Sequence, residues 1–370
     1  MKFSSFAARV RSLVFIGVWG LIHLSGLFSS SAFAQHPQSV TLPDILTFPQ
    51  ASQRSQISQR IGITDITISY HSPAAKGRTI WGGVVPLGKV WRAGANANTT
   101  IAFAHDVKIN GNNLPKGIYG FHLLPQEKDW VLIFSKDYQS WGSEFYSADS
   151  DALRVSVTPE NAENREYLAF DFLERSENTT TIMLHWGTKR CIFKVDVDTK
   201  AIVAENIRKE MRSDVFWNGE ETFKAASYFV NNNIADKNVD TWLQQSMRMS
   251  GGAKFKHLAL RSQLLKQSGN TQKADSVMNA SVKKADDNEV AQYAGDLVFL
   301  YQKYDDAIAM LNASLKLRPD SWYTLFAMGR LSEEVKRFDD ARTYFKQSQA
   351  KAPAENKGMI AKALERIEKR

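Results

Sequence analysis

The sequence predicts two domains of different fold class: an antiparallel β-sandwich or jelly-roll-like domain, followed by an α-helical repeat domain. Between residues 61 and 200, apolar residues recur at every second position in about eight short segments that no helical pattern interrupts. The period becomes helical near Ala201 and stays so. Two short motifs then recur 34 residues apart, and a chain of 370 residues is long for a single core.

Residues 1–34 have the pattern of a secretory signal peptide. A basic start is followed by an apolar run, Leu13 to Leu27, and by small residues at Ala32 and Ala34. A membrane anchor is the alternative, but the run is shorter than the roughly 20 residues that span a bilayer. We therefore expect cleavage after Ala34, export to the periplasm or the medium, and no membrane span in the mature protein.

Residues 35–60 are rich in Gln, Ser and Pro and lack a regular period, so they are expected to form a linker or extended arm. The β domain is predicted for residues 61–200. Its strand-like runs include ITISY, IYGFHLL, WVLIFSK, LRVSV and CIFKVDV, separated by turn-forming stretches such as NGNNLPKG.

Residues 201–254 are predicted to form a degenerate helical repeat, and residues 255–370 a regular one. YDDA at 304–307 recurs as FDDA at 338–341, and Pro319 recurs as Pro353, both at an interval of 34 residues. This period and the placement of Gly, Ala and Pro resemble the tetratricopeptide repeat. Such a repeat needs small residues where two helices cross, and Gly295 and Gly329 occupy equivalent positions in the first helices.

The β half resembles a family of bacterial secreted domains known only as domain of unknown function twenty-nine-eleven. The resemblance rests on SPAAKGRTIWGGVVPLGKVWRAGANANTT, LPKGIYGFHLLP, FSKDYQSWGSEFY and DALRVSV, which follow one another in the family's order and cover about residues 61–198. One departure is Trp186-Gly187, where the family usually has Trp-Glu. The resemblance implies a secreted domain, often with a helical tail, but no activity.

Composition disfavours some classes of function. The net charge of +8 is spread along the chain without a concentrated basic stripe, and export also disfavours nucleic-acid binding. The single cysteine, Cys191, cannot form an internal disulfide and is expected to be a small buried apolar residue.

Signatures of catalysis are absent from the sequence: it has no Gly-x-Ser-x-Gly elbow, no His-Glu-x-x-His and no phosphate-binding loop. Four histidines, His71, His105, His122 and His185, fall in the β half, and a structural role is favoured for each. No catalytic residue, metal ligand or cofactor is predicted. If one histidine is functional, His122 is the first choice, because it lies in a motif shared with the family.

The stretch GKVWRAGANANTT, residues 88–100, and the nearby PAAKGR are the strongest candidates for a ligand site. Glycine and alanine leave backbone accessible, arginine can hold a carboxylate or phosphate with two hydrogen bonds, and the amides and hydroxyls supply further donors and acceptors. The predicted ligand-binding residues are Lys76, Arg78, Arg92, Asn96, Thr99 and His122. The alternative is a self-satisfied turn in which Arg92 bonds loop carbonyls.

The sequence favours an exported binding or scaffold protein over an enzyme. The β domain would hold a polar, anionic or carbohydrate ligand, and the helical repeats would bind a protein partner, because such arrays form grooves suited to peptides or helices. A carbohydrate-active or other hydrolytic enzyme built on the β domain is the alternative, and a structural component of the bacterial envelope is a third possibility.

Overall fold

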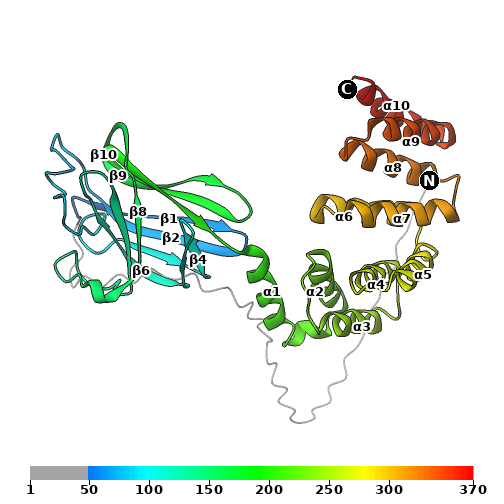
Figure 1. Cartoon of the computed structure of the whole chain (residues 1–370), viewed down its shortest axis with the longest axis horizontal. Helices are drawn as coiled ribbons and strands as arrows, with labels where there is room; N and C mark the ends of the chain where they lie inside the picture. Colours follow the sequence, from blue (N-terminus) through cyan, green and yellow to red (C-terminus); the bar gives the residue numbers. More distant parts are fainter. Residues whose placement is uncertain (1–48, 370) are drawn as a thin grey trace, which may run out of the picture.

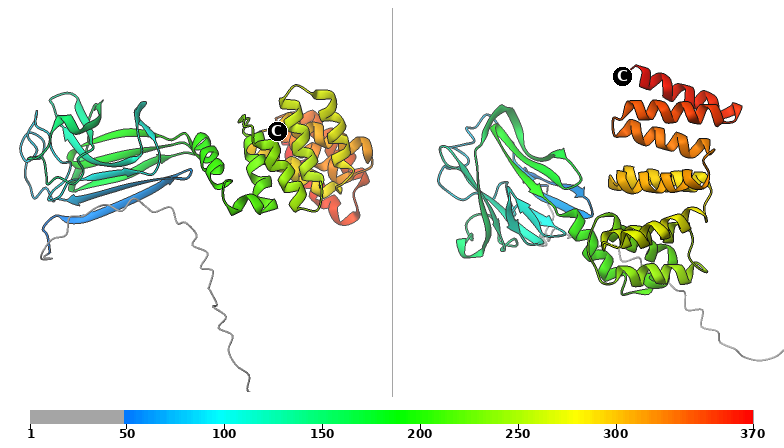
Figure 2. Two further views of the ribbon diagram at one scale, coloured as in Figure 1. Left: turned by 90° about the horizontal axis from the view of Figure 1, so that it is seen from below. Right: turned by 45° about the vertical axis from the view of Figure 1, so that its right-hand side comes forward.

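The computed structural model describes residues 49–369. A β domain leads through helix α1 (Thr199–Glu210) into a stack of helices that ends at α10 (Ala354–Glu368) (Figures 1 and 2). Both halves of the predicted fold class, an antiparallel β region followed by an α region, are confirmed. The predicted signal peptide lies outside the described residues. No helix within residues 49–369 is both long and apolar enough to cross a bilayer.

Two antiparallel sheets build the β domain. The six-stranded sheet has the order β1-β2-β3-β6-β7-β8 and the four-stranded sheet the order β5-β4-β10-β9. The strands of the first sheet are β1 (Gln53–Ile61), β2 (Thr64–Ser72), β3 (Thr100–Phe103), β6 (Gly117–Leu124), β7 (Trp130–Ser135) and β8 (Asp151–Val157). Those of the second are β4 (Val107–Ile109), β5 (Asn112–Leu114), β9 (Glu160–Arg175) and β10 (Thr179–Asp196).

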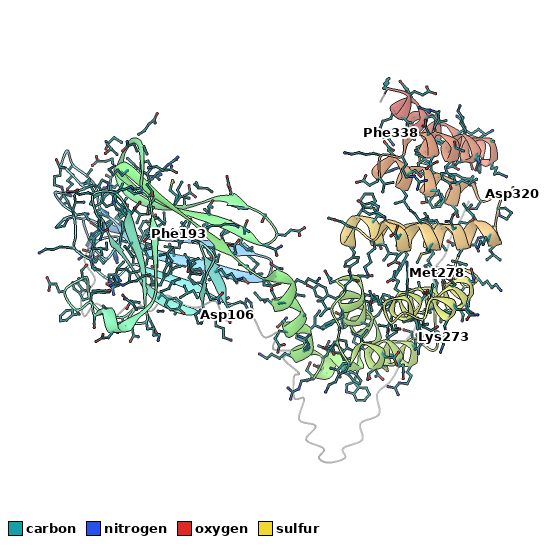
Figure 3. The ribbon with its side chains drawn as sticks, in the orientation of Figure 1. Asp106, Phe193, Lys273, Met278, Asp320 and Phe338 are labelled. Atoms are coloured by element: carbon teal, nitrogen blue, oxygen red, sulfur yellow. The ribbon has the colours of Figure 1, made fainter. Side chains whose placement is uncertain are left out.

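Aromatic side chains from both sheets share one core. Phe193 on β10 lies inside the β domain (Figure 3). Phe121 on β6 stacks on it with ring centroids 5.7 Å apart, and Tyr70 on β2 lies 4.9 Å from Phe170 on β9. Strand alternation explains the arrangement, because every second residue of β6 and β10 points to the same face. Cys191 is fully buried in this core, where burial raises the pKa of its thiol to about 12, so the expectation of a buried apolar residue is confirmed.

The predicted linker at residues 35–60 is wrong at its C-terminal end. Strand β1 occupies Gln53–Ile61 and pairs with β2 along its whole length. Its sequence, QRSQISQRI, is polar because β1 is an edge strand with one neighbour and mostly solvent-facing side chains. Ile57 and Ile61 alone provide apolar contacts to the core, which is too weak a signal to indicate a strand.

The helical half consists of antiparallel pairs. The four pairs are α2 (Gly219–Asn231) with α3 (Val239–Met249), α4 (Phe255–Gln267) with α5 (Thr271–Val282), α6 (Asp287–Tyr301) with α7 (Tyr304–Leu317), and α8 (Trp322–Glu334) with α9 (Phe338–Lys351). The two repeated motifs begin α7 and α9, so equivalent helices start 34 residues apart, as the sequence predicts. The predicted tetratricopeptide-like hairpins from about residue 255 to residue 353 are therefore present.

Candidate functional site

His122 lies on the face of β6 opposite to the aromatic core, between Phe121 and Leu123, which point inward. Its imidazole is only 1% exposed, and neither ring nitrogen has a partner at good hydrogen-bond geometry among residues 49–369, although the backbones of Gly120 and Gly142 lie close to the ring. Burial lowers the pKa of His122, although the backbone of Gly120 and Gly142 and the carboxylates of Asp151 and Asp137 favour the charged ring. A buried histidine without partners is costly, and such groups point to a ligand or to bound water.

Arg92 is held beside the same loop as His122. Its neighbour Trp91 pairs with Leu123 through two backbone hydrogen bonds of 2.8 Å, and the Arg92 amide donates to Ser143 Oγ at 2.9 Å. A methyl group on Gly142 would lie 3.2 Å from Arg92 Nη1, so the guanidinium packs directly on that glycine. The backbone of Gly142 also lies close enough to His122 to favour its charged form, so Arg92 and His122 both lie next to Gly142.

The guanidinium of Arg92 has no ion pair within the described part of the chain, and its buried Nε has no hydrogen-bond partner. Burial lowers the pKa of Arg92, an effect that Glu144 opposes. Arg92 therefore does not cap loop carbonyls, which was the alternative considered for the sequence. A partly buried cation with unused donors is suited to receive an oxyanion.

Further acceptors come from Asp151 and Asn98, and Tyr146 contacts His122 directly. The Tyr146 ring is 5.2 Å from the imidazole, and its hydroxyl donates to Asp151 Oδ2 at 2.7 Å. Arg154 Nε donates to the same oxygen at 2.6 Å, whereas Asp151 Oδ1 is buried without a partner among the residues described. Asn98 Nδ2 donates to Ser140 Oγ at 3.0 Å. The Oδ1 atom of Asn98 is buried and has no hydrogen-bond partner among the described residues.

We call this group the His122 cluster; it comprises Arg92, Asn98, His122, Tyr146 and Asp151. The loop of residues 136–147 contacts it through Ser140, Gly142 and Ser143. The cluster offers donors from Arg92 and acceptors from Asp151 and Asn98, and neutral His122 can supply one of each. This combination can bind a small molecule that carries both an anionic group and hydroxyl groups.

Two of the predicted ligand residues, Arg92 and His122, come together in the cluster. Lys76 and Arg78 are bonded outside the cluster: the backbone amide of Lys76 donates to Glu166 Oε1 at 2.8 Å, and Arg78 Nη2 donates to the carbonyl of Ala74 at 2.7 Å. None of these contacts joins Lys76 or Arg78 to Arg92. Arg78 therefore bonds carbonyls of its own loop, a role that the alternative for the sequence gives to Arg92.

Asn96 and Thr99 also bond within the domain. Asn96 Nδ2 donates to Gln50 Oε1 at 2.7 Å, next to the start of β1, and buried Thr99 donates from Oγ1 to the carbonyl of Ala93 at 3.0 Å. Thr99 therefore shapes the loop that carries Arg92. Asn96 has a positive φ of 55°, which asparagine tolerates better than most residues, so its conformation also shapes the loop.

A second candidate site lies in the helical half. The α6–α8 groove has a volume of about 810 Å³ and is lined by residues along most of the length of α6 and α8. Phe299 on α6 is 67% exposed and lines it, together with apolar side chains of α8. The lining residues are Asn288, Ala291, Gln292, Ala294, Gly295, Val298, Phe299, Leu311, Tyr323, Phe326, Ala327, Arg330, Leu331, Glu333, Glu334, Lys336 and Arg366.

Within residues 49–369, no group of three or more His, Cys, Asp or Glu side chains is arranged to hold a metal ion. The His122 cluster also lacks the hydrogen bond between histidine and aspartate that a hydrolytic triad uses, because Asp151 is bonded to Tyr146 and Arg154 instead.

Comparisons with known proteins agree with this division of the chain. The family described as Protein of unknown function (DUF2911) matches residues 52–195, so the β half is a domain of this family, as its motifs indicate. The match begins at the same place as strand β1. A search of curated proteins gave no match.

Solved structures similar to the chain include MamA MSR-1 C2, with 18% identity and a TM-score of 0.22 over 45% of this chain and 86% of that one. A multi-domain immunophilin from Arabidopsis thaliana has 14% identity and a TM-score of 0.16, covering 60% of this chain and 95% of its own. Because these scores are low, the description of the repeats rests on the helix pairs and the 34-residue period.

Proposed function

Starting from the family match of the β half, we propose that the protein is an exported binding protein with two functional parts. The helical array holds a segment of a protein partner in the α6–α8 groove, and the β domain holds a small polar ligand at the His122 cluster. The signal-peptide pattern of residues 1–34 supports export.

Mass spectrometry of exported material is expected to find Gln35 at the N-terminus.

The exposure of Phe299 is the observation that carries the protein-binding proposal. A phenylalanine that is 67% exposed inside a groove of about 810 Å³ leaves apolar surface in contact with water. Clustered exposed apolar surface marks interaction sites, and aromatic residues contribute strongly to binding when a partner covers them. Arg330 and Lys336 on one side, with Glu333 and Glu334, give the groove a polar rim.

Replacing Phe299 with aspartate is expected to remove partner binding. Peptides selected from a random library on the full chain would be titrated against the wild type and Phe299→Asp, and we expect the affinity to fall by about tenfold or more. Leu317→Asp is the control, because Leu317 on α7 is 42% exposed and does not line the groove. Equal affinity of both variants and the wild type would reject the groove as the binding surface.

The unpartnered atoms of Arg92 and His122 support the second part of the proposal. Buried donors and acceptors without partners destabilise a fold by about 1–3 kcal/mol each, so a cluster of them is expected where a ligand completes the hydrogen bonds. The ligand class that fits is an oxyanion with hydroxyl groups, since Arg92 binds the anion and Asp151 Oδ1 accepts from a hydroxyl.

Arg92→Gln is expected to abolish ligand binding while leaving the fold intact. A thermal-shift screen with inorganic phosphate, acetate, D-gluconate and glycerol would be run on the full chain, and hydroxylated oxyanions are expected to raise the melting temperature of the wild type. Lys89→Gln, which removes the same charge from an exposed position of the same loop, should behave as the wild type. If Arg92→Gln melts much earlier and no compound stabilises either protein, Arg92 has a structural role only.

A further inference from the structure

A second pocket lies on the opposite side of α6, between that helix and α2, with a volume of about 370 Å³. We call it the acidic pocket. Its lining includes Phe223, Ser227 and Asn231 on α2 and Tyr293, Asp296 and Leu297 on α6. It is separate from the α6–α8 groove, because the two share no lining residue.

Unpartnered polar atoms line the inside of the acidic pocket. Ser227 is 9% exposed and Asn231 is 6% exposed, and neither Ser227 Oγ nor Asn231 Oδ1 has a partner at good hydrogen-bond geometry among the described residues, although the Tyr301 hydroxyl lies close to the Asn231 amide. The same holds for the buried hydroxyl of Tyr293. An amide oxygen only accepts hydrogen bonds, and both hydroxyl oxygens can also accept them. The interior of the pocket is therefore suited to a ligand group that donates several hydrogen bonds.

Carboxylates surround the opening. Glu220 pairs with Lys256 at 2.6 Å and Glu221 pairs with Lys224 at 2.8 Å, so these two charges are compensated. Asp296 has no ion pair within residues 49–369. Asp296 as a whole is exposed at the mouth. The protein nevertheless removes part of the water around its carboxyl, and this desolvation raises the pKa of the carboxyl. A cation beside Asp296 would relieve this effect.

Apolar side chains form the walls between the mouth and the interior. Phe223 and Leu297 are buried, and Leu300, at 67% exposure, extends the apolar surface to the rim. A ligand that fits needs an apolar stem and a cationic head with several donors. Lysine has this construction: four methylene groups carry an ammonium group with three N–H donors.

We propose that the acidic pocket binds a lysine side chain of the protein segment held by the helical array. The ammonium group is placed against the unpartnered oxygens of Ser227, Asn231 and Tyr293 in the interior, and the methylene stem packs on Phe223 and Leu297. Asp296, at the mouth, attracts the cation by its charge. This inference rests on the proposed protein-binding function and adds to it the chemistry of one anchor residue. Because α6 separates the pocket from the groove, the lysine would lie across α6 from the side chains that contact Phe299.

The test uses the full chain and a lysine probe, Nα-acetyl-lysine N-methylamide, titrated by nuclear magnetic resonance. The norleucine analogue, which has an apolar stem without the ammonium group, is the control ligand. We expect the lysine probe to bind and the norleucine probe to bind at least about tenfold more weakly. Asp296→Asn should weaken lysine binding by about fivefold or more.

Glu289→Gln is the matched control variant, because Glu289 is exposed on the same helix outside both pockets and loses the same charge. It should bind the lysine probe within about twofold of the wild type. Equal binding of the two probes, unchanged binding by Asp296→Asn, or no binding of lysine would each overturn the inference. The dependence of peptide binding on Phe299 is measured separately, so either proposal can fail while the other stands.

Discussion

Phe193→Ala is expected to destabilise the protein by about 3–5 kcal/mol, which makes it the most damaging of the substitutions considered. Phe193 on β10 is 1% exposed, stacks on Phe121 and meets Phe134 edge-on at 6.1 Å. Phe121 and Phe134 belong to the six-stranded sheet and Phe193 to the four-stranded one. Truncation therefore leaves a cavity where the two sheets meet.

Urea denaturation of the full chain would measure this loss. Phe145→Ala is the control, because Phe145 is 66% exposed and its truncation should change stability by less than about 0.5 kcal/mol. Similar losses for both variants would contradict a core shared by the two sheets.

Gly329→Ala and Gly295→Ala are expected to change stability in opposite directions. A methyl group on Gly329 would lie 2.5 Å from the ring of Phe345, which is fully buried on α9, so α8 and α9 would have to move apart. Overpacking of this kind costs about 1–3 kcal/mol. Gly295 has open space, with Phe299 Cδ2 4.0 Å away, so alanine there should stabilise α6 by about 0.5–1 kcal/mol through its higher helix propensity.

Thermal unfolding followed by far-ultraviolet circular dichroism would compare the two glycine variants. A lower melting temperature for Gly329→Ala and an unchanged or higher one for Gly295→Ala is the expected result. A loss of similar size at both positions would show that the two repeats pack alike, contrary to the structure.

These glycines also show what repeat patterns can and cannot predict. The 34-residue period placed Gly295 and Gly329 at equivalent positions and correctly predicted the helix pairs. It could not distinguish the two sites, because the close approach depends on the side chain of the partner helix. Leu311 occupies on α7 the position that Phe345 occupies on α9. No atom of Leu311 lies within 4 Å of a methyl group placed on Gly295, so the shorter leucine leaves space there.

The strands of the β domain were predictable from a repeating pattern of apolar residues, but the groups that form its candidate site were not. Alternating apolar residues indicate β6 and β10 directly, whereas β1 is polar because it is an edge strand. In the cluster, Arg92 and His122 were predicted as ligand residues, but Tyr146 and Asp151 were missed. The loop of residues 136–147 brings these groups together, and its path depends on contacts between segments far apart in the sequence.

The acidic pocket carries no sequence signal for a comparable reason. Ser227 and Asn231 come from α2, and Tyr293 and Asp296 come from α6, so two helices separated in the chain by α3, α4 and α5 form the site. Each residue alone is an ordinary helix residue. Only the packing of α2 near α6 around one pocket makes them neighbours.

Hydroxyl-radical footprinting of the full chain, with and without a library-selected peptide, tests the central claim most directly. Phe299 and Tyr323 line the α6–α8 groove, whereas Trp217 is 65% exposed and lines neither pocket of α6. We predict that the peptide protects Phe299 and Tyr323 from oxidation and leaves Trp217 as reactive as in the free protein. Protection of the β domain alone, with Phe299 still fully reactive in the complex, would contradict partner binding by the helical array.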